Sequence, residues 1–252
     1  PPRSTLFPYT TLFRSISAPE KVLVVAQSYV EAGAQIILTN TFNSNRLALE
    51  RHGLADQVVA INRAGAELSR QAAVGKAYVF ASMGPTGKLV MMGDVEPEEV
   101  TEAFAEQAQA LAEGGADALL LETQTDLEEV QAAFEGARSA SDLPIGISFT
   151  FDSGANNDRT MMGVTIPQAC QVALELGAAF VGANCGLGIS QFLPLAQAYA
   201  ECKTNLPLWF KGNAGLPELD PAGHTCFRAT PEDYVARSEE RRVGKECRYR
   251  WS

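Results

Sequence analysis

Short apolar runs and longer amphipathic stretches alternate along most of this chain, and this alternation limits the folds that it can adopt. Apolar runs of four to six residues predict strands at residues 36–39, 78–82, 118–121, 145–150, 180–183 and 207–210. The stretches between them predict helices at residues 19–32, 56–73, 98–113, 126–140, 167–176 and 191–202. Strands that alternate with helices in this way form a parallel sheet with right-handed crossovers.

Glycine marks the boundary between several helices and the strands that follow them. The sequences Glu-Ala-Gly-Ala, Glu-Gly-Gly-Ala and Glu-Leu-Gly-Ala contain Gly33, Gly114 and Gly177, and glycine readily takes the left-handed conformation that ends a helix. A further helix is predicted to start at Thr230-Pro231-Glu232, because threonine is a good cap and proline suits the first helical position. The strands are continuously apolar, which is typical of strands buried on both faces.

The two ends of the chain differ from its centre and are related to each other. Residues 1–15 and 237–252 carry net charges of +2 and +3, whereas the whole chain has a formal net charge of -10. The twelve residues STLFPYTTLFRS (4–15) and the twelve residues RSEERRVGKECR (237–248) can be encoded by the two strands of one DNA segment. We therefore expect both ends to be translated sequencing-adapter DNA rather than nucleic-acid-binding tails. The native domain is expected to span residues 16–236, with no nucleic-acid partner.

A polar or glycine-rich cluster follows nearly every predicted strand. These clusters are Asn40-Thr41, residues 84–87, Glu122-Thr123, Asp152-Ser153, Asn184-Cys185-Gly186 and Lys211-Gly212-Asn213. In a barrel all of them would surround one site at the C-terminal face, whereas in an open sheet only the loops beside the switch point would meet. A complete (β/α)8 barrel has eight strands, whereas only six are predicted between the two ends that we exclude. We therefore predict a (β/α)8 TIM barrel that is truncated and lacks its first and last strands.

The cysteine content and the lack of long apolar runs indicate the cellular compartment in which the protein is located. The five cysteines are odd in number and form no Cys-x-x-Cys pair, so a disulfide framework is not expected. No apolar run reaches the roughly 20 residues of a membrane span, and the N-terminus lacks the regions of a signal peptide. We expect a cytoplasmic location and no membrane partner. A homo-oligomer is compatible with the sequence, which does not specify the oligomeric state.

Two side chains at predicted strand ends are candidates for chemistry. Cys185 lies between Asn184 and Gly186; a lone free cysteine is more often a buried small hydrophobic residue than a nucleophile or a metal ligand. Glu122 ends an Ala-Leu-Leu-Leu run, so its carboxylate is expected to point into the mouth of a barrel, where an acid is costly to bury without a partner. Glu122 could bind an ammonium group, act as a base or cap the next helix.

Two further features leave other functions open. Residues 82–87 (SMGPTG) offer backbone N–H groups that could hold an anion, although ordinary tight turns have the same composition. Lys211 could form a Schiff base, as in barrel aldolases, or could be a charge in an anion-binding loop. The alternatives to be kept are therefore a Schiff-base enzyme of the aldolase type and an inactive truncated scaffold.

Six segments, taken in order, resemble the homocysteine S-methyltransferase family. They are residues 33–43 (GAQIILTNTFN), 82–89 (SMGPTGKL), 114–123 (GGADALLLET), 160–165 (TMMGVT), 182–186 (GANCG) and 211–217 (KGNAGLP). Together they cover the body of the chain, and the last three are most similar to the shorter bacterial betaine–homocysteine S-methyltransferases. The resemblance implies a zinc-dependent transfer of a methyl group to the thiol of homocysteine, which gives methionine.

The resemblance also implies roles for individual residues. Cys185 matches a zinc ligand in an Asn-Cys-Gly turn, so it would act in catalysis through Zn²⁺. Glu122 matches the acid that binds the ammonium group of homocysteine. The other substrate-binding residues that the resemblance implies are Asn40, Thr41, Phe42 and Asn184.

Two parts of the family pattern are not found in this sequence. The family's other two zinc ligands lie in a Gly-Gly-Cys-Cys-Gly turn, and its first strand carries an Asp-Gly-Ala-Met-Gly-type turn; this chain contains neither. We therefore expect the parent gene product to be the enzyme, and this chain to bind Zn²⁺ weakly and to be inactive. The methyl donor is left open between betaine, S-methylmethionine and a methyl-corrinoid. An aromatic cage for betaine could draw on Phe42, Phe149, Phe151 and Trp209.

Overall fold

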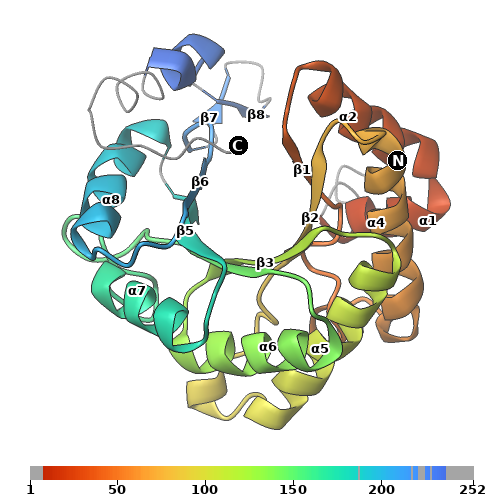
Figure 1. Ribbon diagram of the computed structural model, residues 1–252, viewed down its shortest axis with the longest axis horizontal. Coiled ribbons are helices and arrows are strands. Elements are labelled where there is room, and N and C mark those ends of the chain that lie inside the picture. The colour runs from red at the N-terminus through yellow and green to blue at the C-terminus, as the bar shows by residue number, and fades with distance from the viewer. Residues whose placement is uncertain (1–7, 187, 217, 221–224, 228, 237–252) are drawn as a thin grey trace.

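Six parallel strands form the main sheet of the protein. The structure is a computed structural model that describes residues 8–186, 188–216, 218–220, 225–227 and 229–236. The strands are β1 (Ile36–Leu38), β2 (Tyr78–Met83), β3 (Ala118–Gln124), β4 (Ile145–Phe149), β5 (Phe180–Cys185) and β6 (Leu208–Gly212). Each strand pairs with the next one along the chain, so the sheet order is β1-β2-β3-β4-β5-β6. The sheet curls into an open partial barrel with β1 and β6 at its two edges (Figure 1).

Helices cover the outer face of the curled sheet (Figure 1). The longer ones are α1 (Pro8–Ser17), α2 (Pro19–Glu31), α4 (Val58–Ala73), α5 (Pro97–Glu113), α6 (Leu127–Ala140), α7 (Ile166–Glu175) and α8 (Ile189–Glu201). Short helical segments are α3 (Arg46–Glu50), η2 (Ala55–Gln57) and η3 (Val90–Met92). None of the helices that the structure describes is long and apolar enough to cross a membrane.

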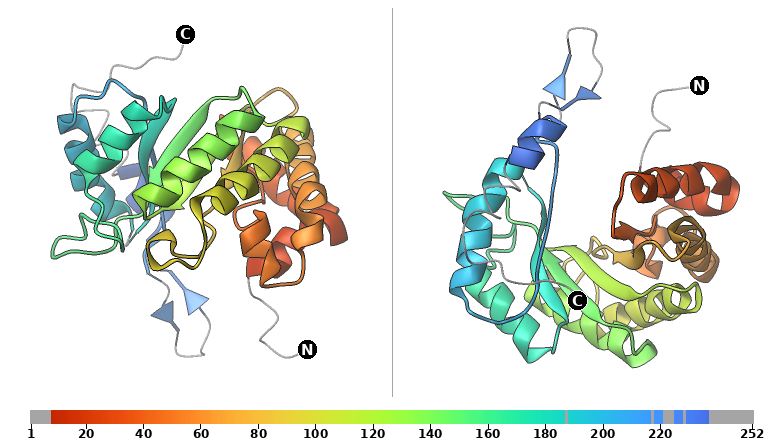
Figure 2. Two further views of the ribbon diagram at one scale, coloured as in Figure 1. Left: turned by 90° about the horizontal axis from the view of Figure 1, so that it is seen from below. Right: turned by 45° about the horizontal axis from the view of Figure 1, so that its top comes forward.

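A small antiparallel ribbon lies outside the barrel. It consists of β7 (Glu218–Leu219) and β8 (Thr225–Cys226), and it projects away from the main sheet in both views of Figure 2. Residues 231–236, which follow it, are helical. The backbone N–H of Asp233 donates a hydrogen bond to Thr230 Oγ1 at 3.3 Å, so Thr230 caps this helix as the sequence predicts.

The predicted α/β class and the truncated barrel are confirmed. A doubly wound sheet would place its first strand in the interior of the sheet, whereas here β1 is an edge strand and the order follows the sequence. All six predicted strands are present, although β3 runs three residues further and β5 two residues further than expected. Of the two predicted adapter-like ends, residues 8–15 fall within α1, and residues 1–7 and 237–252 lie outside the described residues.

Helix starts in the chain follow ordinary capping chemistry. Asp126 Oδ1 accepts a hydrogen bond from the N–H of Glu128 and so caps α6. At the start of α7, Thr165 and Gln168 form a reciprocal capping box. Such caps satisfy backbone N–H groups that have no partner inside the helix, which explains why these helix boundaries were predictable to within one or two residues.

Different side chains cover the two faces of the sheet. Residues such as Leu119, Leu121 and Ile147 lie in the hydrophobic core between the sheet and the helices. On the inner face, the rings of Phe80, Phe180 and Trp209 lie 5.4–5.9 Å apart, although they come from β2, β5 and β6. Phe180 is buried and Phe80 and Trp209 are half-buried, so their packing removes apolar surface from water. Aromatic rings therefore fill the middle of the partial barrel.

Candidate active site

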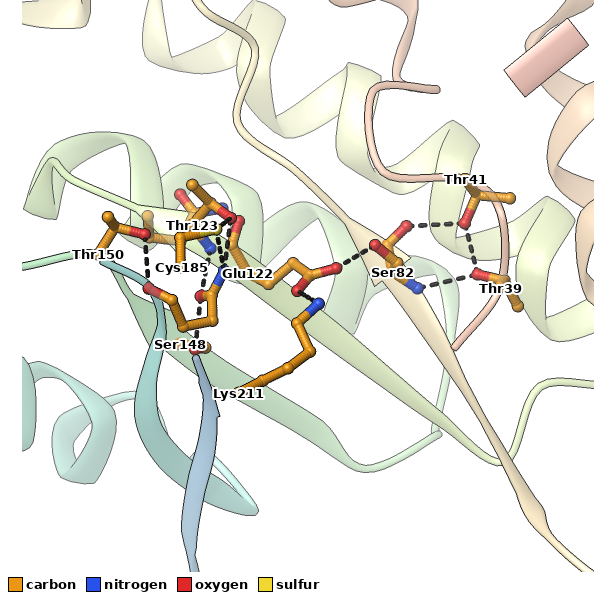
Figure 3. A network of polar contacts seen from close by, with 11 residues as sticks. Thr39, Thr41, Ser82, Glu122, Thr123, Ser148, Thr150, Cys185 and Lys211 are labelled. Carbon is orange, nitrogen blue, oxygen red and sulfur yellow. Dashed lines mark hydrogen bonds and ion pairs between the residues drawn. The ribbon is translucent and has the colours of Figure 1, made fainter. Parts of the chain in front are cut away.

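Glu122 is a buried carboxylate at the C-terminal end of β3, and it has two partners from other strands. Its exposed fraction is 3%. One carboxylate oxygen accepts a hydrogen bond from the hydroxyl of Ser82 on β2. The other lies 2.5 Å from Nζ of Lys211 on β6. Figure 3 shows these side chains converging. Because burial of an unpaired charge is costly, the ion pair explains how an acid can be kept at this position.

Asn184, at the end of β5, is the centre of a second set of polar contacts. Its Oδ1 accepts hydrogen bonds from the backbone N–H of Thr123 at 2.9 Å and from Ser148 Oγ at 2.7 Å. Its Nδ2 donates to Thr123 Oγ1 at 2.7 Å and to Cys185 Sγ at 3.2 Å. With an exposed fraction of 1% and four hydrogen bonds, the amide has one fixed orientation, and it fixes the direction of the Cys185 thiol.

Thr123 and Cys185 both have a left-handed backbone conformation. Their φ angles are +63° and +60°, a region that a β-branched residue such as threonine rarely adopts. Each such residue costs on the order of 1–3 kcal/mol and is kept only when its surroundings impose it. Here Asn184 hydrogen-bonds both residues, and the carbonyl of Cys185 accepts a hydrogen bond from the N–H of Asn213 at 3.1 Å. Strain of this kind is concentrated at functional sites.

The turn after β1 is tied to Glu122 through Ser82. Thr41 is fully buried, and its hydroxyl donates to the carbonyl of Ser82 at 2.7 Å. The N–H of Ser82 donates to Thr39 Oγ1 at 2.9 Å. Thr41 therefore acts on the site through Ser82 and has no surface of its own to offer a ligand.

Asn40 and Phe42 contact segments of the chain outside the cluster of Glu122 and Asn184. Asn40 Nδ2 donates to Ser15 Oγ at 3.3 Å. The carbonyl of Phe42 accepts a hydrogen bond from the N–H of Gly84 at 2.6 Å, and a side chain on Gly84 would meet the Phe42 ring at 2.7 Å. The structure thus brings Glu122 and the Asn184-Cys185 turn into one cluster, joins Thr41 to it indirectly, and places Phe42 against the turn after β2.

Three members of the cluster have contacts that were not predicted from the sequence, although Lys211 was considered there as a Schiff-base lysine. Ser82, Ser148 and Lys211 all lie on strands and contact Glu122 or Asn184. Their common signal is a polar residue at the last inward-facing position of an otherwise apolar strand. By contrast, Asp152, which also follows a strand, is exposed and accepts a hydrogen bond from the neighbouring Ser153.

The glycine-containing turn at residues 84–87 is held by hydrogen bonds to other segments of the protein. The N–H and the hydroxyl of Thr86 both donate to Glu129 Oε1 at 2.7 Å, and Arg51 donates to the carbonyl of Thr86. An N–H group that could have held an anion is therefore already used by a carboxylate of α6. Burial raises the pKa of Glu129, and the two hydrogen bonds from Thr86 oppose this rise.

Replacing Glu129 by glutamine is expected to change the pH dependence of stability. A raised folded-state pKa of an acid means that its ionised form is disfavoured in the folded state, so wild-type stability falls as the pH rises above about 4.5. Glutamine keeps the acceptor for Thr86 and does not ionise. The free energy of unfolding of Glu129→Gln relative to wild type should therefore increase between pH 4.5 and 8 in urea titrations. The exposed neighbour variant Glu128→Gln should show no such trend, and an equal trend in both variants would contradict the account.

A zinc ion would need several ligands among the described residues. Among them there is no group of three or more His, Cys, Asp or Glu side chains that could hold a metal. Cys185 is a single sulfur donor whose neighbours are an amide and a hydroxyl, with Thr123 Oγ1 at 3.7 Å from Sγ. Zinc sites in proteins use three or four protein ligands. The described residues therefore do not fit a zinc ion on their own.

The aromatic residues considered for a betaine cage lie in different places. Phe149 and Phe151 are buried in the core on the helix side, where Phe151 contacts Tyr199 edge to face. Trp209 stacks on Phe80 on the inner face of the sheet. Phe149 and Phe151 therefore cannot join Trp209 in a cage, and that part of the expectation is wrong.

The fold and the site define a (β/α)-barrel type of enzyme domain, in which side chains at the C-terminal ends of parallel strands converge on one site. The family profile described as homocysteine S-methyltransferase matches residues 5–250. The chain belongs to the homocysteine S-methyltransferase family.

Two relatives agree with this assignment. Over 219 residues the chain is 32% identical to the methionine synthases of Mycobacterium leprae (strain TN) and Mycobacterium tuberculosis (strain ATCC 25618 / H37Rv). The matched region is 81% of this chain and 18% of each relative, so the chain spans about a fifth of their length.

Solved structures of similar fold include the homocysteine methyltransferase MmuM from Escherichia coli, in its oxidised and metallated forms. Both have a TM-score of 0.66 and 20% sequence identity, and the superposition covers 94% of this chain. It covers 89% of the oxidised and 90% of the metallated MmuM chain. At this identity the similarity supports the barrel-type fold.

Proposed function

We propose that this chain is the homocysteine-binding part of an enzyme that transfers a methyl group to the thiol of homocysteine and so forms methionine. The observation that carries the proposal is one cluster in which the carboxylate of Glu122, at the end of β3, and the thiol of Cys185, at the end of β5, are linked through Thr123 and Asn184. Membership of the family and the identity to two methionine synthases give the reaction class.

In this proposal the residues of the site have separate tasks. Glu122 binds the ammonium group of homocysteine, because a buried carboxylate is a strong partner for a cation. Asn184 holds the turn that carries Cys185, so that the thiol has one direction. Thr41 supports Ser82 beneath Glu122, and Asn40 and Phe42 shape the rim together with the turn at residues 84–87.

We further propose that Cys185 is one ligand of a Zn²⁺ ion in the complete enzyme. A thiolate on a strand-end turn is a suitable zinc ligand, and a relative of the same fold has been solved in a metallated form. Two more ligands would have to come from cysteines other than those described here. A cytoplasmic location is part of the same proposal, and the state of oligomerisation is left to measurement.

The proposed reaction is tested with the intact gene product that contains residues 16–236. We expect methionine to form from homocysteine with one of betaine, S-methylmethionine or methylcobalamin, measured by mass spectrometry. Cys185→Ser should lower this rate roughly 100-fold or more, because a hydroxyl is a poor substitute for a metal-binding thiolate. The control Cys226→Ser changes an exposed cysteine and should leave the rate unchanged. Failure of all three donors, or full activity of Cys185→Ser, would contradict the proposal.

The Schiff-base alternative receives less support. Nζ of Lys211 is engaged by Glu122 at 2.5 Å, and the family assignment is to methyl transfer. Borohydride treatment with a carbonyl substrate should therefore give no covalent adduct at Lys211. The inactive-scaffold alternative applies only to this chain by itself. We expect this chain to have no methyl-transfer activity unless further zinc ligands are supplied.

A further inference from the structure

The ion pair between Glu122 and Lys211 occupies the position at which the proposed function places the ammonium group of homocysteine. Lys211 Nζ lies 2.5 Å from one carboxylate oxygen of Glu122, and Ser82 binds the other oxygen. Both oxygens are therefore in use in this structure. A substrate ammonium group that binds the second oxygen would compete with Nζ of Lys211 for it.

The two members of the pair differ in their freedom to move. The Glu122 side chain is 4% exposed, and it comes from β3, which is paired on both sides. The Lys211 side chain is 42% exposed, and it comes from β6, an edge strand of the described sheet. Lysine also carries its charge on a flexible four-carbon stem. Displacement would therefore move Lys211 and leave Glu122 in place.

A displaced Lys211 would need a new anionic partner. Homocysteine is a zwitterion, and its carboxylate is attached to the same carbon atom as its ammonium group. When the ammonium group binds Glu122, the carboxylate therefore lies within a few ångströms of the point from which Lys211 has moved. Two new charge-assisted hydrogen bonds then replace one, and the site keeps its net charge.

We propose that Lys211 is a substrate-binding residue that exchanges partners: it pairs with Glu122 in the empty site and binds the carboxylate of the α-amino acid when substrate enters. This inference rests on the proposed function, and it makes the pair of Glu122 and Lys211 a recognition site for the zwitterionic head of an α-amino acid. It predicts selection against thiols that carry only an amine or only an acid.

The test compares binding of three thiols to the full chain by isothermal titration calorimetry under reducing conditions. The probes are L-homocysteine, 4-sulfanylbutanoic acid, which lacks the amine, and 3-aminopropane-1-thiol, which lacks the carboxylate. Lys211→Met should weaken homocysteine binding roughly 10- to 100-fold, because a charge-assisted hydrogen bond is lost. The same variant should bind 3-aminopropane-1-thiol as tightly as wild type or more tightly, because no lysine has to be displaced.

Two controls keep the outcomes distinct. Lys76→Met removes an exposed lysine and should bind all three thiols as wild type does. Lys211→Arg keeps the charge and should bind homocysteine within about threefold of wild type. Three results would overturn the exchange. Lys211→Met could weaken the binding of all three probes equally, Lys211→Met and Lys211→Arg could weaken homocysteine binding equally, or Lys211→Met could leave homocysteine binding unchanged. If wild type binds none of the probes, the proposed function fails, and the exchange fails with it.

Discussion

Replacing Glu122 by glutamine is expected to weaken the binding of homocysteine roughly 30- to 1,000-fold, equivalent to about 2–4 kcal/mol. Glutamine has nearly the same shape and can still accept the hydrogen bond from Ser82, so the change removes mainly the negative charge. The side chain is almost fully buried, and in such a place water cannot compensate for the lost partner of an ammonium group. Lys211, left without its counter-ion, would in addition repel the incoming cation.

The measurement for Glu122→Gln is calorimetric titration with L-homocysteine, with folding checked by circular dichroism. A matched control is Glu113→Gln, which removes a carboxylate that pairs with Arg63 at the surface. Surface ion pairs contribute little, so the control should bind homocysteine as wild type does. Affinity of Glu122→Gln within threefold of wild type would show that the ammonium group binds elsewhere.

Replacing Gly182 by alanine is expected to cause a large loss of stability. Gly182 lies in β5 and pairs with Trp209 of β6. A Cβ atom at this position would lie 1.7 Å from the carbonyl oxygen of Trp209 and 2.8 Å from its nitrogen. These atoms belong to the backbone of a paired strand, so the contact cannot be relieved by a rotamer change.

The expected cost of Gly182→Ala is about 3 kcal/mol or more, at the upper end of the range for overpacked interiors. For a domain of this size, that corresponds to a melting temperature lower by roughly 6–12 °C. Because Gly182 is two residues before Asn184, and its carbonyl accepts the hydroxyl of Tyr199 at 2.7 Å, movement of β5 should also weaken homocysteine binding.

The control for this prediction is Gly177→Ala. Gly177 has a positive φ of 70° and nothing within 4 Å of an added Cβ, so only backbone strain of about 1 kcal/mol is expected. Urea unfolding followed by circular dichroism should show at least twice the loss for Gly182→Ala. A loss of 1 kcal/mol or less for Gly182→Ala would contradict the close strand packing described above.

The main elements of the fold were predictable because each has a local chemical signal. Continuous apolar runs predicted the strands, and glycine or capping residues predicted helix boundaries, as at Gly33 and Thr230. The short helix α3, the ribbon of β7 and β8, and the extra residues of β3 have no such periodic signal. Most of the helix α1, residues 8–15, belongs to the segment that is expected to be adapter-derived because of its relation to the other end of the chain.

The candidate site was predictable only in part. Glu122 and Cys185 could be singled out because each follows an apolar run, and the structure places both in one cluster. The partnership of Glu122 with Lys211, 89 residues away, depends on the curvature of the sheet, which no local pattern encodes. The left-handed conformation of Thr123 was also unpredictable, since threonine disfavours it and the surroundings impose it.

The most direct test of the central claim is a crystal structure of this chain in complex with L-homocysteine. We predict that the amino nitrogen lies within hydrogen-bonding distance of the Glu122 carboxylate and that the sulfur points toward Cys185 Sγ. A ligand bound in the reverse orientation, or bound away from the ends of β3 and β5, would contradict the assignment of this site.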